Sequence, residues 1–405
     1  MWVTWISWGA ASLALVTLLY WFYMLYEVTN GLPAIEPLPA ATDEPGSGDL
    51  PLVSIIVAAK EEESSIAETV RRLEAQSYPK IEIIAVNDRS TDTTGLKLNE
   101  LKKWTEQKES TGLRMRIIHI TSLPKGWIGK NHALYQGYLQ AKGKYLLFAD
   151  ADVNLQPDAI RDAVAYMQQH ETDHLTLAPT IKTGDWMLKQ FVSFFFFTFF
   201  MFFRPWRANR DKQRRFGIGI GAFNLIRRDA YERIGTHRAF AMRPDDDLQL
   251  GMQVKRSGLR QRFLLGLDSA EVEWYPNISK AITGLEKNLF SGFDYRLGYA
   301  LLGILLQLLF FVFPFAGIWI AYWFGGPWVS AAYLASIAIM LSLYAVFIRK
   351  LSRSSGIEAP FLPLAALVMA YTFIRAVFLT LRRGGITWRG TFYSLEELKF
   401  LSKKW

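Results

Sequence analysis

Long apolar runs stand near both ends of the chain. The first carries no charge before Glu27, and three more follow one another closely near the C-terminus. Each run is long enough to cross a hydrocarbon core of about 30 Å as a helix. Buried helices of a globular core would also be apolar, but the clustering of three runs favours membrane spans. The runs cover residues 3–26, 298–323, 328–348 and 361–381.

These runs define the predicted domain organisation. Residues 1–30 lack a basic n-region and a clear small-residue cleavage site, so we interpret them as an N-terminal transmembrane anchor rather than a signal peptide. Residues 31–51 are rich in Pro, Gly and small residues, which is typical of a linker. Residues 297–382 would form the C-terminal transmembrane helices, and residues 383–405 a basic tail.

Residues 52–290 show a different pattern, in which short β-branched runs alternate with segments of helical apolar spacing. Continuous apolar strands are typical of a sheet that is covered on both faces. The alternation therefore predicts an α/β domain with a parallel sheet flanked by helices. The predicted strands are 52–60, 81–88, 115–120 and 144–150, and the predicted helices are 64–76, 93–108 and 131–142.

Carboxylates follow three of the predicted strands. Ligands of open parallel sheets bind beyond the carboxyl ends of the strands, so these side chains would gather at one edge. Asp150 and Asp152 would face the same side of a strand end. Two such carboxylates repel each other unless a cation lies between them, and Mg²⁺ commonly uses one or two carboxylates together with substrate phosphates. We therefore predict a metal that bridges the protein to a diphosphate, with a solvated turn as the alternative.

Two further positions favour a nucleotide ligand. Asp88 follows the second strand, where a carboxylate can accept hydrogen bonds from a base or ribose, although the residues after it would also suit a helix N-cap. Lys130 precedes a predicted helix, and a lysine and a helix N-terminus both favour anions. An exposed basic loop is the alternative for Lys130.

Glycines and aspartates mark the later part of the domain. Gly217, Gly219 and Gly221 alternate with apolar residues, which is not the GxGxxG phosphate pattern. They would suit either a close approach of the backbone to a sugar or acceptor, or a bulged strand. Three aspartates, at 245–247, precede a helical stretch. Capping needs only one of them, so a surplus carboxylate is a candidate general base.

A Phe-rich segment, residues 188–207, interrupts the predicted domain. Nine of the thirteen residues 191–203 are Phe, and this run is short because spans need about 20 residues. Arginines follow it directly. We interpret the segment as an interfacial helix with its apolar face in lipid, and a buried core helix of the soluble domain is the alternative.

The overall composition agrees with a membrane location. Of 405 residues, 51% are hydrophobic and 15% aromatic; the formal net charge is +9 and there is no cysteine. The missing cysteine excludes disulfides and thiolate metal sites. The basic segments 204–215 and 349–353 predict a cytoplasmic catalytic domain in a multi-pass protein of the cell membrane. Three spans after that domain would place the basic tail outside, so a re-entrant segment is an alternative to three full spans.

Five motifs in order resemble glycosyltransferase family 2 enzymes with the GT-A fold, over about residues 52–265. The motifs are VSIIVAAKEEE, VNDRSTD, GKNHAL, FADADV and PDDDLQLG. The flanking membrane segments resemble the subgroup that glycosylates lipids, including carotenoid- and hopanoid-associated enzymes. ITWRGTFYSL (386–395) is similar to a segment found after the last span in that subgroup. The resemblance implies a Rossmann-like GT-A nucleotide-diphospho-sugar transferase domain flanked by transmembrane helices.

The resemblance also implies roles for the donor-side residues. Asp150 and Asp152 would hold Mg²⁺ or Mn²⁺ on the diphosphate, and Asp150 would also belong to the donor-binding set. The remaining nucleotide-sugar contacts would come from Ala59, Glu62, Asp88 and Lys130.

The general base would come from the acidic helix start. Asp245 matches the aspartate of the family's base motif, counted back from Leu248. Asp246 is the alternative, because Pro244 replaces the acidic residue that usually stands before that aspartate.

The implied function is inverting, metal-dependent transfer of a single sugar to a lipid or hydrophobic acceptor, with terpenoids and carotenoids among the candidates. The Q-x-x-R-W motif of polymerising members is absent at 284–296, which favours a single transfer. A membrane nucleotidyltransferase or pyrophosphorylase is one alternative, and a non-catalytic membrane scaffold with a decayed transferase domain is another. We expect no nucleic-acid partner.

Overall fold

The computed structural model describes residues 2–41, 50–107 and 114–402, and the chain forms two compact units. We call the first the sheet unit, which consists of Ile35–Lys182, Phe203–Trp274 and Gly385–Trp405. The second, the helical unit, consists of Met1–Ala34, Thr183–Phe202 and Tyr275–Gly384. The chain therefore passes from one unit to the other five times.

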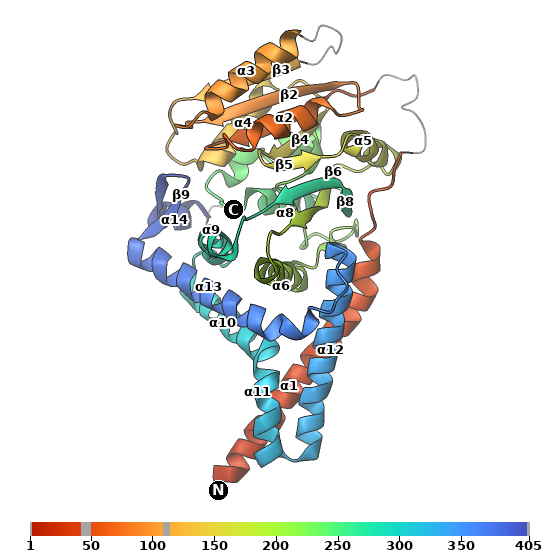
Figure 1. Cartoon of the computed structure of the whole chain (residues 1–405), viewed down its shortest axis with the longest axis vertical. Helices are drawn as coiled ribbons and strands as arrows, with labels where there is room; N and C mark the ends of the chain where they lie inside the picture. Colours follow the sequence, from red (N-terminus) through yellow and green to blue (C-terminus); the bar gives the residue numbers. More distant parts are fainter. Residues whose placement is uncertain (1, 42–49, 108–113, 403–405) are drawn as a thin grey trace. The chain divides into compact units, whose positions relative to one another are not determined.

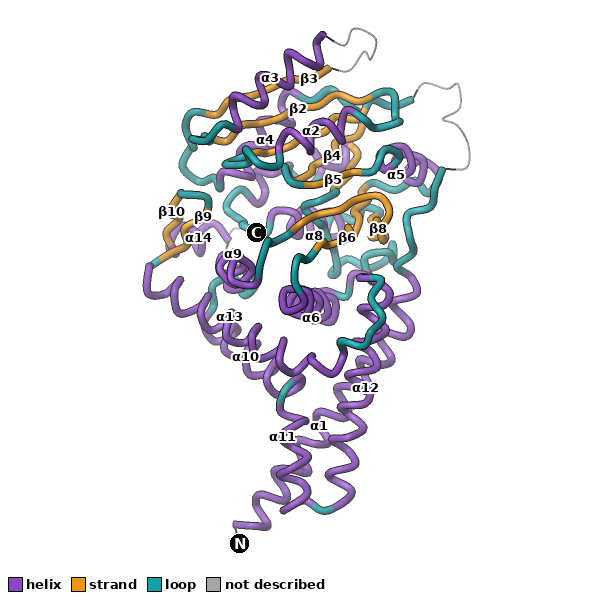
Figure 2. The backbone as a smooth tube through the Cα atoms, viewed as in Figure 1, coloured by secondary structure: helices purple, strands orange, loops and turns teal. Residues whose placement is uncertain are grey.

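The sheet unit contains an eight-stranded sheet of order β3-β2-β1-β4-β7-β6-β8-β5 (Figures 1 and 2). The four predicted strands are β1 to β4, and they pair in parallel as expected. A separate two-stranded hairpin lies near the C-terminus. The strands are β1 (Val53–Ala59), β2 (Ile81–Asp88), β3 (Arg114–Ile120), β4 (Tyr145–Asp150), β5 (Val153–Leu155), β6 (His174–Lys182), β7 (Asn224–Arg227), β8 (Gln261–Glu273), β9 (Gly385–Trp388) and β10 (Thr391–Ser394).

The prediction of a parallel sheet is correct for β1 to β4, but the sheet as a whole is mixed, and among the added strands β6 and β8 pair in parallel. β7 pairs antiparallel with β4 and β6, and β5 pairs antiparallel with β8. Although only Ala151 and Asp152 separate β5 from β4 in the chain, β5 does not pair with β4 but lies at the edge of the sheet beside residues 270–272 of β8.

Helices cover both faces of this sheet. Consecutive residues of β1 point to opposite faces, so Ile55 packs into one core and Ile56 into the other. The first core includes side chains of α2, α3 and α5, and the second includes side chains of α4, α7 and α8. A fully buried aliphatic side chain of this kind contributes about 1.5–3 kcal/mol. The helices of this unit are α2 (Ile66–Glu74), α3 (Thr94–Gln107), α4 (Gly129–Gln140), α5 (Ala159–Gln169), α7 (Arg228–Arg233), α8 (Asp246–Arg256) and α14 (Leu395–Ser402).

The helical unit holds the long apolar helices. Among the residues that the structure describes, four helices are long and apolar enough to cross a membrane, or five if α10 and α11 count together as one bent span. α1 and α12 lie side by side (Figure 1), and the Tyr333 hydroxyl donates to the Ala10 carbonyl at 2.9 Å. These helices indicate membrane association. The helices are α1 (Trp2–Gly31), α6 (Trp186–Phe203), α9 (Ile278–Ser291), α10 (Leu297–Phe311), α11 (Phe313–Ile320), α12 (Pro327–Ser352) and α13 (Leu362–Arg383).

The first C-terminal run, 298–323, is broken rather than continuous. α10 and α11 meet at an angle of 55°. Pro314 stands in the first turn of α11, where its missing N–H and its ring are tolerated, whereas a continuous helix would be interrupted. This geometry fits a broken span or a re-entrant segment.

The Phe-rich segment forms α6, and several of its phenylalanine rings pack against other helices of the helical unit. Phe194 and Phe197 contact Phe311 of α10 edge-on, and Phe197 also lies 5.0 Å from the ring of Tyr344 on α12. Phe202 at the end of the helix is exposed. α6 also meets the length and composition test for a membrane span. Its interfacial placement stays a prediction.

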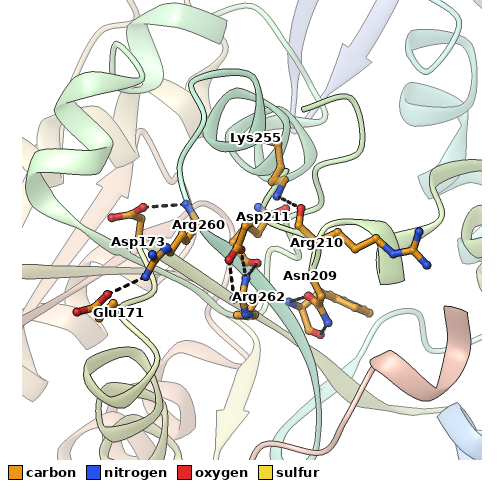
Figure 3. Close-up of polar contacts among 10 residues, drawn as sticks. Glu171, Asp173, Asn209, Arg210, Asp211, Lys255, Arg260 and Arg262 are labelled. Carbon is orange, nitrogen blue, oxygen red and sulfur yellow. Dashed lines mark hydrogen bonds and ion pairs between the residues drawn. The ribbon is translucent and has the colours of Figure 1, made fainter. Parts of the chain in front are cut away.

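The basic segment after α6 is bound to the sheet unit (Figure 3). The ammonium group of the fully buried Lys255 donates to the Arg210 carbonyl at 2.9 Å. Asp211 forms an ion pair with Arg262 at 2.6 Å. Asn209 both donates to and accepts from the backbone of Phe263 on β8. The arginines of this segment are therefore part of the catalytic domain's surface.

The unit boundaries differ from those drawn on the sequence. Residues 275–290, which the sequence assigned to the catalytic domain, lie in the helical unit. Glu286 of α9 pairs with Arg375 of α13 at 2.7 Å, which binds these two helices together. Conversely, the tail from Gly385 onward lies in the sheet unit. In the predicted linker, Glu36 and Leu38 form backbone hydrogen bonds with Leu265, and residues 42–49 lie outside the described residues.

Candidate active site

The carboxyl ends of β1, β2 and β4 form the edge where the site lies. β1 lies between β2 and β4, so connections leave this point in opposite directions along the sheet. Such a switch point is where open α/β sheets bind ligands. Ala58 pairs with Asp150 and Ala59 with Asn87, so the three strands end at the same level. The acidic residues that follow them are thereby gathered at one edge.

Lys130 connects two of the predicted site residues. It is the second residue of α4, and its ammonium group lies 2.7 Å from Asp150 and 3.3 Å from Asp246. Burial raises the pKa of the Asp246 and Asp247 carboxyls. The surrounding carboxylates in turn raise the pKa of Lys130 despite its burial. One ammonium group faces three carboxylates, so the cluster keeps surplus negative charge.

Asp152 adds to this negative charge. Burial, followed by the charges of Asp150 and Glu62, raises the pKa of Asp152 to about 7, and the Arg389 charge acts in the opposite direction. A buried carboxyl with this environment is stabilised by a cation. Within residues 2–41, 50–107 and 114–402, no three acidic or histidine side chains converge closely enough to hold a metal by themselves. The residues fit a divalent cation that takes its other ligands from a bound diphosphate.

The two candidate bases have different surroundings. The Arg243 guanidinium binds both oxygens of Asp245 at 2.9 Å, and Gln249 donates to the same carboxylate at 2.8 Å. Asp246 is only 4% exposed and is directed to Lys130. The structure thus brings Asp246, and not Asp245, to Lys130 and Asp150.

Asn131 is a site residue that the sequence analysis did not single out. Its side-chain amide lies within hydrogen-bond distance of the carbonyls of Phe240, Ala241 and Arg243, at 2.9–3.1 Å. These carbonyls belong to the loop that leads into α8. Asn131 therefore fixes the position of the acidic helix start, and its place directly after Lys130 was the only sequence signal.

The alternating glycines allow close packing at this site. A Cβ at Gly221 would collide with the Asp150 carboxylate, and one at Gly219 would collide with the Asp247 backbone. The Gly221 N–H donates to the Asp247 carboxylate at 2.8 Å. The glycines therefore allow the backbone of residues 219–221 to pack closely against α8 and the Asp150 side chain.

The predicted nucleotide residues lie at the neighbouring strand ends. Asp88 is buried and accepts two hydrogen bonds from the Arg89 guanidinium, at 2.7 and 3.0 Å. Arg89 has a left-handed backbone (φ 55°), a conformation that costs energy outside glycine and is often found at functional sites. Glu62 follows β1 and accepts from Arg389 at 2.6 Å. Ala59 is fully buried at the end of β1.

The Gly129 N–H at the start of α4 already has a partner, because it donates to the Tyr393 hydroxyl at 3.1 Å. Tyr393 and Arg389 belong to the C-terminal hairpin. Neither residue was among the predicted site residues, because the segment 386–395 carried only a resemblance to the family.

The chain is similar in sequence and in fold to known glycosyltransferases. Residues 54–235 match glycosyl transferase family 2. The 4,4'-diaponeurosporenoate glycosyltransferase of Staphylococcus aureus is 23% identical over 359 residues, covering 85% of this chain and 89% of that protein. The beta-monoglucosyldiacylglycerol synthase of Synechocystis is 29% identical over 171 residues, covering 41% of this chain and 32% of that protein. Several curated relatives are matched over only 32–49% of their own length.

Among solved structures, the mannosyltransferase PcManGT from Pyrobaculum calidifontis, in complex with GDP-Man and Mn²⁺, superimposes with a TM-score of 0.53. The alignment covers 92% of this chain and 98% of that one at 16% identity, which supports the fold alone. The family match runs from β1 through α7 and includes the strand ends that carry the acidic residues. Residues 54–235 are therefore similar to glycosyl transferase family 2, and the chain has a GT-A-like sheet.

Proposed function

We propose that this enzyme transfers a single sugar from a nucleotide-diphosphate sugar to a lipid acceptor, with inversion at the anomeric carbon. The observation that carries the proposal is the Lys130 bridge. One ammonium group binds Asp150 at the end of a donor-side strand and Asp246 at the start of α8. The Lys130 ammonium group thereby binds both Asp150, on the side of the diphosphate, and Asp246, the candidate base.

Asp246 would act as the general base. It would take the proton of the acceptor hydroxyl as the hydroxyl oxygen bonds to the anomeric carbon. The bond from that carbon to the diphosphate breaks, and its electron pair leaves with the diphosphate. Asp245 is less suited because Arg243 and Gln249 already occupy its oxygens. The proposal therefore reverses the preference drawn from the sequence.

The donor would lie along the strand ends. Asp150 and Asp152 would hold Mg²⁺ or Mn²⁺, which would offset the charge of the leaving diphosphate. Lys130 would supply a second positive charge there. Ala59, Glu62 and Asp88 would border the nucleotide.

The acceptor is proposed from the helical unit and the relatives. The chain carries apolar helices that fit a membrane, and the two curated relatives are named for a diaponeurosporenoate and a glucosyldiacylglycerol. A terpenoid acceptor is preferred because the match to the first of these covers most of both chains. Transfer would occur at the cytoplasmic face of the membrane.

The test measures release of nucleoside diphosphate by the full chain purified in lipid, with a panel of nucleotide sugars and lipid extracts containing carotenoids or diacylglycerol. We expect release with Mn²⁺ and loss of release with EDTA. Asp152→Ala should reduce release by at least about a hundredfold, on the scale of losing a metal that stabilises the leaving group. Asp229→Ala, which removes an exposed carboxylate paired with Arg227, is the matched control and should retain activity. Equal release by Asp152→Ala and the control would overturn the metal assignment.

A further inference from the structure

The hairpin of β9 and β10 belongs to the sheet unit although it follows the last helix of the helical unit. Its two-residue turn consists of Arg389 (φ 47°) and Gly390 (φ 77°), both with positive φ as a type I′ hairpin turn requires. The short strands pair from Thr391–Trp388 to Ser394–Gly385. Figure 2 shows the hairpin next to α14.

α14 stabilises the hairpin from its other end. The Ser394 hydroxyl accepts from the Glu397 N–H at 3.2 Å, and the Glu397 carboxylate accepts from the Ser394 N–H at 3.1 Å. This reciprocal arrangement is a capping box. Leu398 of α14 is buried. The hairpin is therefore a built element of the sheet unit.

Arg389 at the tip of the hairpin contacts the end of β1. Its guanidinium donates to the Lys60 carbonyl at 2.9 Å and to the Glu62 carboxylate at 2.6 Å. The Glu62 side chain is 14% exposed in this ion pair. The planar arginine guanidinium can donate to a carbonyl and a carboxylate at the same time. A lysine ammonium can also contact both groups, but its geometry is less fixed.

The strand β10 contacts the other two loops of the same edge. Tyr393 accepts from the Gly129 N–H at the start of α4. Thr391 accepts from Arg89, at 3.5 Å, in the loop after β2. One hairpin thus binds the loops that follow β1 and β2 and the helix that carries Lys130.

We propose that the C-terminal hairpin is a structural part of the donor site, and that Arg389 is a positioning residue that holds Glu62 and the loop after β1 in the geometry that binds a nucleoside diphosphate. This inference rests on the proposed function, because it concerns the same donor. Arg389 acts through Glu62, so its effect falls on donor affinity and not on the chemical step.

The test uses the full chain in lipid and compares Arg389→Ala, Arg389→Lys and Glu62→Gln with the wild type. Binding of UDP and of GDP, each with Mn²⁺, is measured by calorimetry, and the KM and kcat for the active nucleotide sugar are measured separately. The matched control is Arg382→Ala, which removes an exposed arginine that precedes Arg389 by seven positions in the sequence and lies outside the hairpin. Thermal unfolding shows whether each variant is folded.

We expect Arg389→Ala to raise the nucleotide Kd and the donor KM by about tenfold, the scale of one lost hydrogen bond to a charged group. The kcat should change little, Arg389→Lys should restore part of the affinity, and Arg382→Ala should match the wild type. In the Glu62→Gln background, Arg389→Ala should have a smaller further effect, because the contact with the Lys60 carbonyl is still lost.

Two outcomes would overturn the inference in different ways. An active wild type whose donor KM is unchanged in a folded Arg389→Ala variant would refute the hairpin's role and leave the proposed function intact. A wild type that binds neither nucleotide and uses no nucleotide sugar would refute the proposed function and this inference with it.

Discussion

Asp245 and Asp246 are neighbours in sequence with different partners in the structure. Asp245 is held by Arg243, two residues before it, whereas Asp246 meets Lys130 from a helix more than a hundred residues earlier in the chain. A sequence motif can place the pair at a helix start. It cannot show which of the two carboxylates turns toward the site, because that depends on the packing of α8 against α4.

The role of Asp246 as general base can be tested by substitution. Asp246→Asn should reduce kcat by about 10²–10⁴-fold, the usual contribution of a positioned base, with a smaller change in donor KM. Asp245→Asn should lose far less activity, because its carboxylate is already bound by Arg243 and Gln249. The measurement is steady-state kinetics of both variants in lipid. A larger kcat loss in Asp245→Asn would return the role of base to Asp245.

At the level of secondary-structure elements, the buried His174 connects β6 to β7 and β8 through side-chain hydrogen bonds. His174 of β6 is fully buried, and its ring nitrogens contact Asn224 at 3.1 Å and Gln261 at 2.7 Å. The Gln261 amide can only donate through its nitrogen, so the facing Nδ1 of His174 accepts and the ring is neutral. Burial lowers the pKa of His174 to about 4.

The second prediction follows from this lowered pKa. The unfolded chain binds a proton at His174 below a pH of about 6.5, whereas the folded chain does not until about pH 4. Stability is therefore fully present above pH 6.5 and is lost as the pH falls toward 4, by about 2 kcal/mol at pH 5. The apparent Tm should fall between pH 7 and pH 5, and the fall should be smaller in His174→Asn. An equal fall in both proteins would assign the pH dependence to other groups.

At the scale of the whole molecule, the sheet unit is assembled from three separate stretches of chain. Membrane-type helices precede it, interrupt it once and interrupt it again before the final hairpin. The C-terminal tail, which the sequence assigned to a separate basic segment, belongs to the unit that carries the site. This observation also removes the need for the tail to lie on the opposite side of a membrane from the catalytic domain.

The third prediction concerns this orientation. Protease added to intact spheroplasts of a bacterial expression host should leave the sheet unit uncut, because we place it at the cytoplasmic face. Lysis of the spheroplasts should expose it to cleavage in the basic segment 204–215. The fragments are followed with antibodies against the sheet unit. Cleavage there in intact spheroplasts would place the catalytic domain outside.

Local signals were enough to predict β1 to β4 and the helices between them. Strands that are buried on both faces are almost continuously apolar, and helices show their period directly in the sequence. The later strands were not predicted. β5 and β7 are only three and four residues long, while β6 and β8 are longer but contain polar positions that break the continuous apolar run of the earlier strands. Hydropathy does not predict the bend within 298–323, because it reports the length of an apolar run and not the direction of the helix axis.

The α/β domain, the membrane-type helices, the family resemblance and the acidic strand ends can be predicted from the chain alone, because each depends on residues that are close together in sequence. Three contacts appear only once the chain is folded: Lys130 joins Asp150 to Asp246, Asn131 fixes the loop before α8, and Arg389 reaches Glu62. The last pair is separated by 327 positions. Contacts at such separations depend on how the elements pack, and no periodicity or spacing in the sequence records them.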